Sequence, residues 1–269
     1  MRVEEIEQHL KKDLLPFWKN LKDVSYGGFY GEMDYDLNLH QKADKGCILN
    51  SRILWFFSNA YKTIQDQESL SYADHAYEYL TKAFYDEENG GVYWSVTYGG
   101  KPKDDTKHTY NQAFAIYALA SYYGASKNKD ALSLAYALID RIETDCKDEM
   151  GYLEAFDRNF KPASNEKLSE NGIMAVRTMN TLLHVYEAYT EVYLVDPNEK
   201  IADRLKWMLD LFADKYPAGN WISLKITLPS HVKVSLPAAV IDIETGLSVV
   251  FFQAVLALDA NTPVEASPG

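Results

Sequence analysis

The sequence predicts an all-α protein built from repeated helical pairs with short β-hairpins between them. A glycine signal recurs at Gly28, Gly91, Gly151 and Gly219, with spacings of 63, 60 and 68 residues. Two segments lie between successive glycines, and in each the apolar residues recur every three or four positions, which is typical of an amphipathic helix. Because one helical pair cannot bury its apolar face alone, neighbouring pairs must stack. The stack is either an open superhelix or a closed ring with inner and outer helices.

The first three repeats share one expected order of elements: an acidic turn, a glycine, a short strand and two helices. The glycines supply a positive φ, and the β-forming residues that follow them indicate a strand. Pro197 falls between two helices, where its missing N–H does no harm. Helices are expected at residues 4–20, 46–63, 71–84, 109–123, 129–146, 174–195 and 198–215.

Composition and charge argue against several classes of protein. The chain has 269 residues, of which 47 % are hydrophobic and 25 % are charged, as is ordinary for a globular protein. Its formal net charge of −12 argues against nucleic acid or an anionic membrane as a partner, because like charges repel. No apolar run approaches ~18 residues, so no transmembrane helix is expected. The first residues of the sequence contain no apolar signal segment. The two cysteines, Cys47 and Cys146, are expected to be buried free thiols. Both observations predict a cytoplasmic protein.

In a ring, the helices that follow the hairpins would be inner, and residues near their N-terminal ends would face a common centre. Arg52 interrupts an apolar stretch of the first inner helix, where a guanidinium suits an anionic or hydroxyl-rich ligand. The alternative is an Arg that pairs with a nearby carboxylate. Tyr110 stands among polar residues at the start of the second inner helix. There the alternative is that Thr109 or Asn111 caps the helix while Tyr110 packs at its end.

The third inner helix carries a polar stripe on an apolar background. Asn180, His184 and Glu187 are spaced i, i+4 and i+7, which places them on one face. The alternative is a core histidine with satisfied hydrogen bonds. The sequence has no phosphate loop, dinucleotide fingerprint, nucleophile elbow or metal-ligand spacing, so neither a cofactor nor a metal is expected. These residues together indicate a site for an uncharged, hydroxyl-rich ligand, and therefore a carbohydrate.

Several short segments form a recognisable set. They are residues 16–18 (PFW), 27–31 (GGFYG), 42–46 (KADKG), 51–61 (SRILWFFSNAY), 90–94 (GGVYW), 107–111 (KHTYN), 154–158 (EAFDR), 168–172 (LSENG) and 178–180 (TMN). With these segments the sequence resembles the cellobiose 2-epimerases of the N-acylglucosamine 2-epimerase family, over roughly the first 215 residues. The resemblance implies an (α/α)6 toroid, of which the repeat spacing leaves room for about four of six repeats.

The resemblance also implies an activity and a set of roles. The expected reaction is reversible epimerisation at C2 of the reducing-end sugar of β-1,4-linked disaccharides, through ring opening and an enediolate, without a cofactor. Cellobiose would give glucosyl-mannose, and lactose would give epilactose. By the resemblance, Arg52 holds the oxygens at C1 and C2 and stabilises the enediolate. Tyr110 and Asn180 hydrogen-bond the sugar, and His184 assists ring opening or binds the ring oxygens.

The tail departs from the family pattern. The two proton-transferring histidines of the family would come further along the chain, but Ile241 stands where one is expected and the other has no counterpart. We therefore expect toroid repeats over residues 1–216 and a divergent tail over 217–269, as from a truncated gene or a change of reading frame. For this chain we expect weak or no conversion of cellobiose.

Other functions remain open on the sequence. Within the family, the substrate could be N-acylglucosamine or free mannose. A non-catalytic sugar binder would keep the same four residues and turn nothing over. A glycoside hydrolase on the same toroid would need two carboxylates across a cleft, for which Glu154, Asp157 and Glu170 are candidates. The alternative for these three carboxylates is that they are solvated turn residues.

Overall fold

A computed structural model describes residues 3–164 and 176–215. Gly219, Glu170, Ile241 and the tail predicted at 217–269 lie outside the described residues. The chain starts with α1 (Val3–His9), η1 (Leu10–Leu14) and α2 (Leu15–Lys19). Three helical pairs follow: α3 (Cys47–Ile64) with α4 (Gln67–Tyr79), α5 (Thr109–Ser126) with α6 (Lys129–Arg141), and α7 (Met179–Val195) with α8 (Glu199–Lys215).

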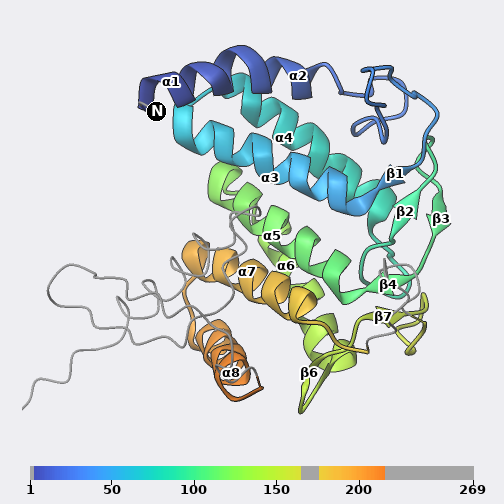
Figure 1. Cartoon of the computed structure of the whole chain (residues 1–269), viewed down its shortest axis with the longest axis vertical. Helices are drawn as coiled ribbons and strands as arrows, with labels where there is room; N and C mark the ends of the chain where they lie inside the picture. Colours follow the sequence, from blue (N-terminus) through green and yellow to red (C-terminus); the bar gives the residue numbers. More distant parts are fainter. Residues whose placement is uncertain (1–2, 165–175, 216–269) are drawn as a thin grey trace, which may run out of the picture.

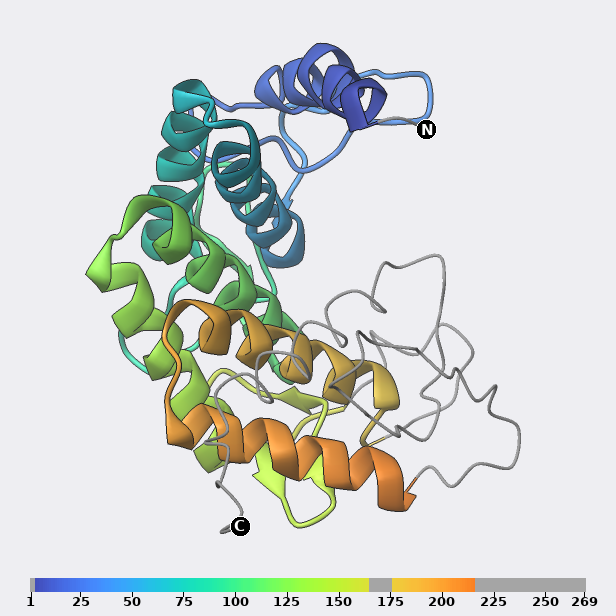
Figure 2. The same ribbon diagram turned by 90° about the vertical axis from the view of Figure 1, so that its left-hand side faces the viewer.

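The helical pairs form two layers. Helix α5 lies between α3 and α7, and α4, α6 and α8 each pack on the inner helix that precedes them in the chain (Figure 1). Turned by 90°, the pairs follow one another along an arc (Figure 2). The structure therefore confirms an all-α fold of helical pairs with inner and outer members, the arrangement of the (α/α)6 toroid class.

Short antiparallel strands link successive pairs. One sheet has the order β1 (Lys45–Gly46), β2 (Ser95–Val96), β3 (Pro102–Asp104), and β5 (Lys147–Asp148) pairs with β6 (Gly151–Tyr152). Strand β4 (Lys107–His108) pairs with β7 (Ala155–Phe156), with His108 opposite Ala155. Because β1 and β4 each lead directly into an inner helix, this pairing fixes the N-terminal ends of α3 and α5 against the next repeat.

An ion pair recurs beneath each acidic turn. An aspartate from the turn meets a cation that stands two residues before the next inner helix, in the pairs Asp23–Lys45, Asp86–Lys107 and Asp148–Arg177. Both lysine side chains are fully buried, and each Nζ also donates to a turn carbonyl, that of Gly27 or Gly90, at 2.7 Å. Gly27 and Gly90 have the positive φ expected of these turns. The repeat therefore attaches every inner helix to the turn before it.

The element boundaries differ from the predicted ones where side chains cap helices. Helix α4 begins four residues before the predicted start, because Asp66 accepts the backbone N–H groups of Glu68 and Ser69. Helix α7 begins at Met179 rather than 174, and Thr178 caps it by accepting the N–H of Thr181. The leading helix contains a π-helical turn, η1, and two outer helices end in such turns, η2 (Leu80–Phe84) and η3 (Ile142–Cys146), which the sequence analysis did not predict.

The core lies between the two helical layers. Large side chains that are almost fully buried include Phe29, Phe57 and Phe84 of the first repeat and Tyr189 of the third. Cys47 and Cys146 are buried free thiols, as predicted. Among the helices of the described ranges, none is both long and apolar enough to cross a lipid bilayer.

Candidate functional site

The four residues predicted to bind a sugar lie on three neighbouring inner helices. Arg52 stands in the second turn of α3 and Tyr110 in the first turn of α5. Asn180 and His184 stand one turn apart at the start of α7. Since α5 packs against both α3 and α7, residues from the N-terminal halves of all three helices meet on one face.

The ring of Phe114 contacts three of these four residues, Arg52, Tyr110 and His184. The guanidinium carbon of Arg52 lies 4.7 Å from the centre of the Phe114 ring. The centre of the His184 ring lies 4.7 Å from the centre of the Phe114 ring. It also lies 4.7 Å from the centre of the Tyr110 ring, and the planes of His184 and Tyr110 meet at 84°. Cation–π and edge-to-face contacts of this kind orient side chains without using their hydrogen-bonding atoms.

Arg52 stands exposed at this position. Its side chain has no carboxylate partner among the residues that the structure describes, so the ion-pair alternative raised by the sequence does not hold within them. Within the described residues the guanidinium donates to no protein group, while the Phe114 ring holds its position. A planar fork with five N–H donors suits two adjacent oxygens of a sugar.

Burial and three neighbouring side chains, Arg52, Asn180 and Glu187, shift the pKa of Tyr110. Burial raises the pKa of this phenol. The positive charge of Arg52 and a hydrogen bond with Asn180 act in the opposite direction, and the charge of Glu187 raises the pKa again. With its pKa raised overall, the phenol stays protonated near neutral pH and can donate a hydrogen bond.

His184 is almost fully buried and makes one hydrogen bond to the residues that the structure describes. Its side chain is 9 % exposed, and Nδ1 lies 2.9 Å from Oε2 of Glu187, one turn further along α7. Within residues 3–164 and 176–215, no protein group pairs with Nε2. The imidazole therefore offers one nitrogen to a ligand while a carboxylate occupies the other.

A second layer continues along the same helix faces toward their C-terminal ends. Trp55 stacks on Tyr117, with ring centres 5.6 Å apart and planes at 18°. Below them, Asn59 donates to Ser121 at 3.3 Å, and Ser121 donates to Glu191. This layer ties the three inner helices together beneath the candidate site.

Sequence reasoning missed the aromatic members of the site. Phe114, Trp55 and Tyr117 lie in apolar runs, so none of them was among the predicted site residues. A usable signal exists in their spacing, since Trp55 is three residues from Arg52, and Phe114 and Tyr117 are four and seven residues from Tyr110. Residues at these separations share a helix face.

The polar residues at the start of α5 do not cap it. The helix begins after His108 with no side-chain cap, so the alternative that Thr109 or Asn111 caps α5 is wrong. The Thr109 hydroxyl donates to the carbonyl of Leu153, and the Asn111 amide donates to that of Tyr93 at 2.8 Å. Both side chains therefore fix α5 to loops of the neighbouring segments.

The carboxylates considered for a hydrolase have structural partners. Glu154 is 2 % exposed, and its two oxygens accept the N–H of Thr178 at 2.6 Å and the hydroxyl of Thr181 at 2.7 Å. Since it is buried and holds the start of α7, Glu154 is not a solvated turn residue. Asp157 accepts backbone N–H groups of its own loop from Asn159 and Lys161.

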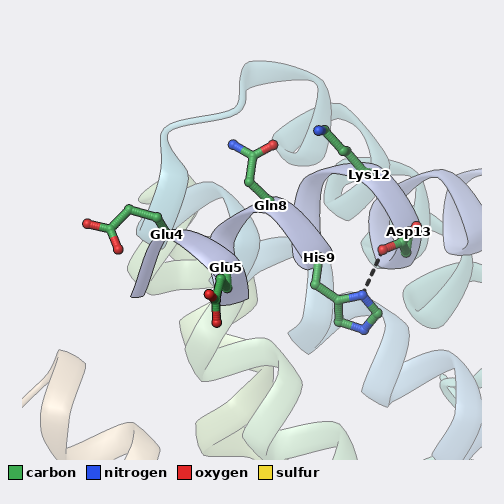
Figure 3. Close-up of a pocket in the computed structure, with 6 residues that line it drawn as sticks. All are labelled: Glu4, Glu5, Gln8, His9, Lys12 and Asp13. Carbon is green, nitrogen blue, oxygen red and sulfur yellow. Dashed lines mark hydrogen bonds and ion pairs between the residues drawn. The ribbon is translucent and has the colours of Figure 1, made fainter. Parts of the chain in front are cut away.

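The hollow drawn in Figure 3 belongs to the leading helix. It has a volume of about 410 Å³ and is lined by Glu4, Glu5, Gln8, His9, Lys12 and Asp13. One exposed helical segment supplies all of these residues, and none of the four predicted sugar-binding residues is among them. In the described ranges, no cluster of three or more histidine, cysteine, aspartate or glutamate side chains could hold a metal ion.

Comparison with known proteins identifies relatives of the chain. A cellobiose 2-epimerase from Ruminococcus albus is 56 % identical over 226 residues, which cover 84 % of this chain and 58 % of that protein. A D-mannose isomerase from Marinomonas mediterranea is 25 % identical over 203 residues, covering 75 % of this chain and 48 % of the isomerase. The chain thus spans a little over half the length of the curated epimerase that it matches.

A solved structure and a family model agree with these relatives. The structure of the cellobiose 2-epimerase from Bacillus thermoamylovorans B4167 matches with a TM-score of 0.84 at 39 % identity, covering 97 % of this chain and 68 % of that one. The model of the N-acylglucosamine 2-epimerase (GlcNAc 2-epimerase) family matches residues 28–222. The resemblance read from the short segments is therefore confirmed, and the chain belongs to the N-acylglucosamine 2-epimerase family.

Proposed function

We propose that the chain acts on the reducing-end sugar of a β-1,4-linked disaccharide, in reversible epimerisation at C2. The observation that carries the proposal is the convergence of Arg52, Tyr110 and His184 on the Phe114 ring, with Asn180 beside Tyr110. The relative at 56 % identity, a cellobiose 2-epimerase, favours a disaccharide over the free mannose of the isomerase at 25 % identity.

Each side chain suits one requirement of the reaction. The sugar ring must open before the C2 proton is acidic enough to remove, and the enediolate that forms needs positioned donors. Arg52 supplies these donors to the oxygens at C1 and C2. Tyr110 and Asn180 hydrogen-bond the hydroxyl groups, and His184 exchanges protons during ring opening.

The described residues supply binding and ring opening in this proposal. Ile241 stands where the family resemblance implies one of the proton-transferring histidines. We therefore expect transfer of the C2 proton to be slow, so that cellobiose binds to this chain and is converted to glucosyl-mannose weakly or not at all.

The proposal includes a neutral sugar ligand and a cytoplasmic location. A disaccharide carries no charge, so the net charge of −12 does not oppose its binding as it would oppose nucleic acid. The two cysteines, Cys47 and Cys146, are free and buried, which agrees with a reducing compartment.

Titration calorimetry with cellobiose, followed by sugar chromatography, tests the proposed function. The native chain should bind cellobiose, and Arg52→Met should weaken binding about tenfold or more, the value of one charged hydrogen bond. Lys200→Met is the matched control, because Lys200 lies on α8 and pairs with exposed Asp140. Absence of binding, or release of glucose as from a hydrolase, would contradict the proposal.

A further inference from the structure

We propose that Glu187 is a positioning residue that holds the His184 imidazole in one tautomer, with the proton on Nδ1 and a bare Nε2 available to the sugar. The inference deepens the proposed function, on which it rests for the identity of the ligand. The carboxylate of Glu187 is an acceptor, so the nitrogen that it meets at 2.9 Å must be the one that carries the proton. The hydrogen bond made by one ring nitrogen fixes the protonation of the other.

Two aromatic rings flank the imidazole and limit its movement. The ring centres of Phe114 and Tyr110 each lie 4.7 Å from that of His184. The His184 side chain is 9 % exposed. Glu187 is itself 15 % exposed, so its carboxylate is largely withdrawn from water. In a site of low exposure, a charged hydrogen bond is stronger than at the surface. Nε2 is then the nitrogen without a protein partner in the part of the chain that the structure describes.

A bare Nε2 gives His184 a defined step in ring opening. The O1–H bond of the reducing-end sugar breaks and its proton goes to Nε2, while C1 and O1 form the carbonyl. The C1–O5 bond breaks in the same event, and O5 takes the proton back from Nε2 of the imidazolium. The imidazole ends as it began, so the step needs no further reactant. The negative charge of Glu187 stabilises the imidazolium in between.

Glu191 provides a matched control on the same helix face. It stands one turn beyond Glu187, is similarly withdrawn from water at 13 % exposure, and pairs with Lys62 and Ser121 rather than with a histidine. Substituting either glutamate by alanine removes a largely buried carboxylate from α7. Of the two changes, only Glu187→Ala removes the acceptor of the His184 ring proton.

The test is the ¹⁵N NMR spectrum of the His184 ring in the full chain, assigned with His184→Gln. In the native protein, with the imidazole neutral, Nδ1 should give the signal of a protonated nitrogen and Nε2 that of a bare one. In Glu187→Ala the two signals should move toward each other, because the freed ring exchanges its proton between both nitrogens. Glu191→Ala should leave both signals in place. A bare Nδ1 in the native chain, or no response to Glu187→Ala, would overturn the inference.

Cellobiose titration supplies a second readout. Glu187→Ala should weaken binding about tenfold, and Glu187→Gln, which keeps an acceptor oxygen, should lose less. Equal losses in the alanine and glutamine variants would contradict a role through the tautomer. If the native chain does not bind cellobiose, the proposed function fails, whereas the NMR measurement still decides the role of Glu187.

Discussion

Asp86 stabilises the start of α5 through several charged contacts. Its carboxylate accepts from Lys107 Nζ at 3.1 Å and from Arg158 Nε and Nη2 at 3.0 and 3.1 Å, and its side chain is 1 % exposed. Burial by itself would raise the pKa of this carboxyl group. The hydrogen bonds from Arg158 and Lys107 outweigh burial and hold the pKa well below its ordinary value.

This depressed pKa predicts a specific loss of stability in acid. The folded-state pKa lies below the unfolded-state value of about 3.9, so the contribution of Asp86 is complete above that pH and is lost as the pH falls below it. The free energy of unfolding should therefore fall more steeply below about pH 4 in the native chain than in Asp86→Asn. The variant should also be less stable at neutral pH by about 3–5 kcal/mol, because it leaves Lys107 buried without its partner.

Urea unfolding at a series of pH values between about 2 and 6 measures both effects. Asp140→Asn is the control, since Asp140 is 63 % exposed and its ion pair with Lys200 is at the surface. If the native and Asp86→Asn curves run parallel below about pH 4, the contacts of Asp86 do not set the acid sensitivity.

Single residues of the site were predictable to different degrees. Arg52 and His184 stand out because a polar group inside an apolar helix needs an explanation. Phe114 does not stand out, because an aromatic ring in an apolar run is indistinguishable from a core residue until its neighbours are known. The burial of Glu154 was not predictable because a glutamate in a turn is usually exposed, whereas here it is buried and accepts hydrogen bonds from Thr178 and Thr181 at the start of α7.

The turns depend on glycines at which a side chain has no room. Gly28 has a φ of +65°, and a Cβ placed there would lie 2.4 Å from Cδ1 of Tyr79. Gly28→Ala should therefore lower the free energy of unfolding by about 1–3 kcal/mol or more, through backbone strain and displacement of Tyr79. Circular dichroism during thermal or urea unfolding measures the change.

Gly46 supplies the control for this turn prediction. It has a φ of −83°, and a Cβ there would meet nothing within 4 Å. Gly46→Ala should change stability by less than about 1 kcal/mol. Equal stabilities for Gly28→Ala and Gly46→Ala would show that the turn before α3 does not constrain the fold.

The helices were more predictable as units than at their ends. Period-3.6 patterning identified every inner and outer helix of the described ranges, because burial of one face demands it. The boundaries depend on single capping contacts, such as Asp66 before α4 and Thr178 before α7. The π turns η1, η2 and η3 escaped prediction, since one extra residue in a turn shifts the apolar pattern too little to be recognised.

At the scale of the whole molecule, stacking of pairs was predictable but its curvature was not. The repeat spacing and the helical periodicity of the sequence did not distinguish an open superhelix from a closed ring. The choice depends on the angle between successive pairs, which the strand links β1–β2 and β4–β7 help to fix. Since each of these four strands is only two residues long, no strand pattern in the sequence defines them.

The two thiols test whether the repeats open together. Cys47 begins α3 and Cys146 ends the second outer helix, yet both lie against the first turn of α5, Cys47 near Asn111 and Cys146 near Thr109. Burial raises the pKa of each thiol to about 12, against about 8.5 in an unfolded chain. Neither thiol should therefore react with a disulfide reagent at about pH 8 until the chain unfolds.

Because α5 covers both thiols, one opening event should expose both. In moderate urea, Cys47→Ala and Cys146→Ala each keep a single thiol, and the two labelling rates should match each other and the unfolding rate measured by circular dichroism. If the repeats opened separately, as the units of some repeat proteins do, the two thiols would be labelled at different rates. A thiol that reacts quickly in the folded chain would show that α5 does not bind its two neighbours into one cooperative unit.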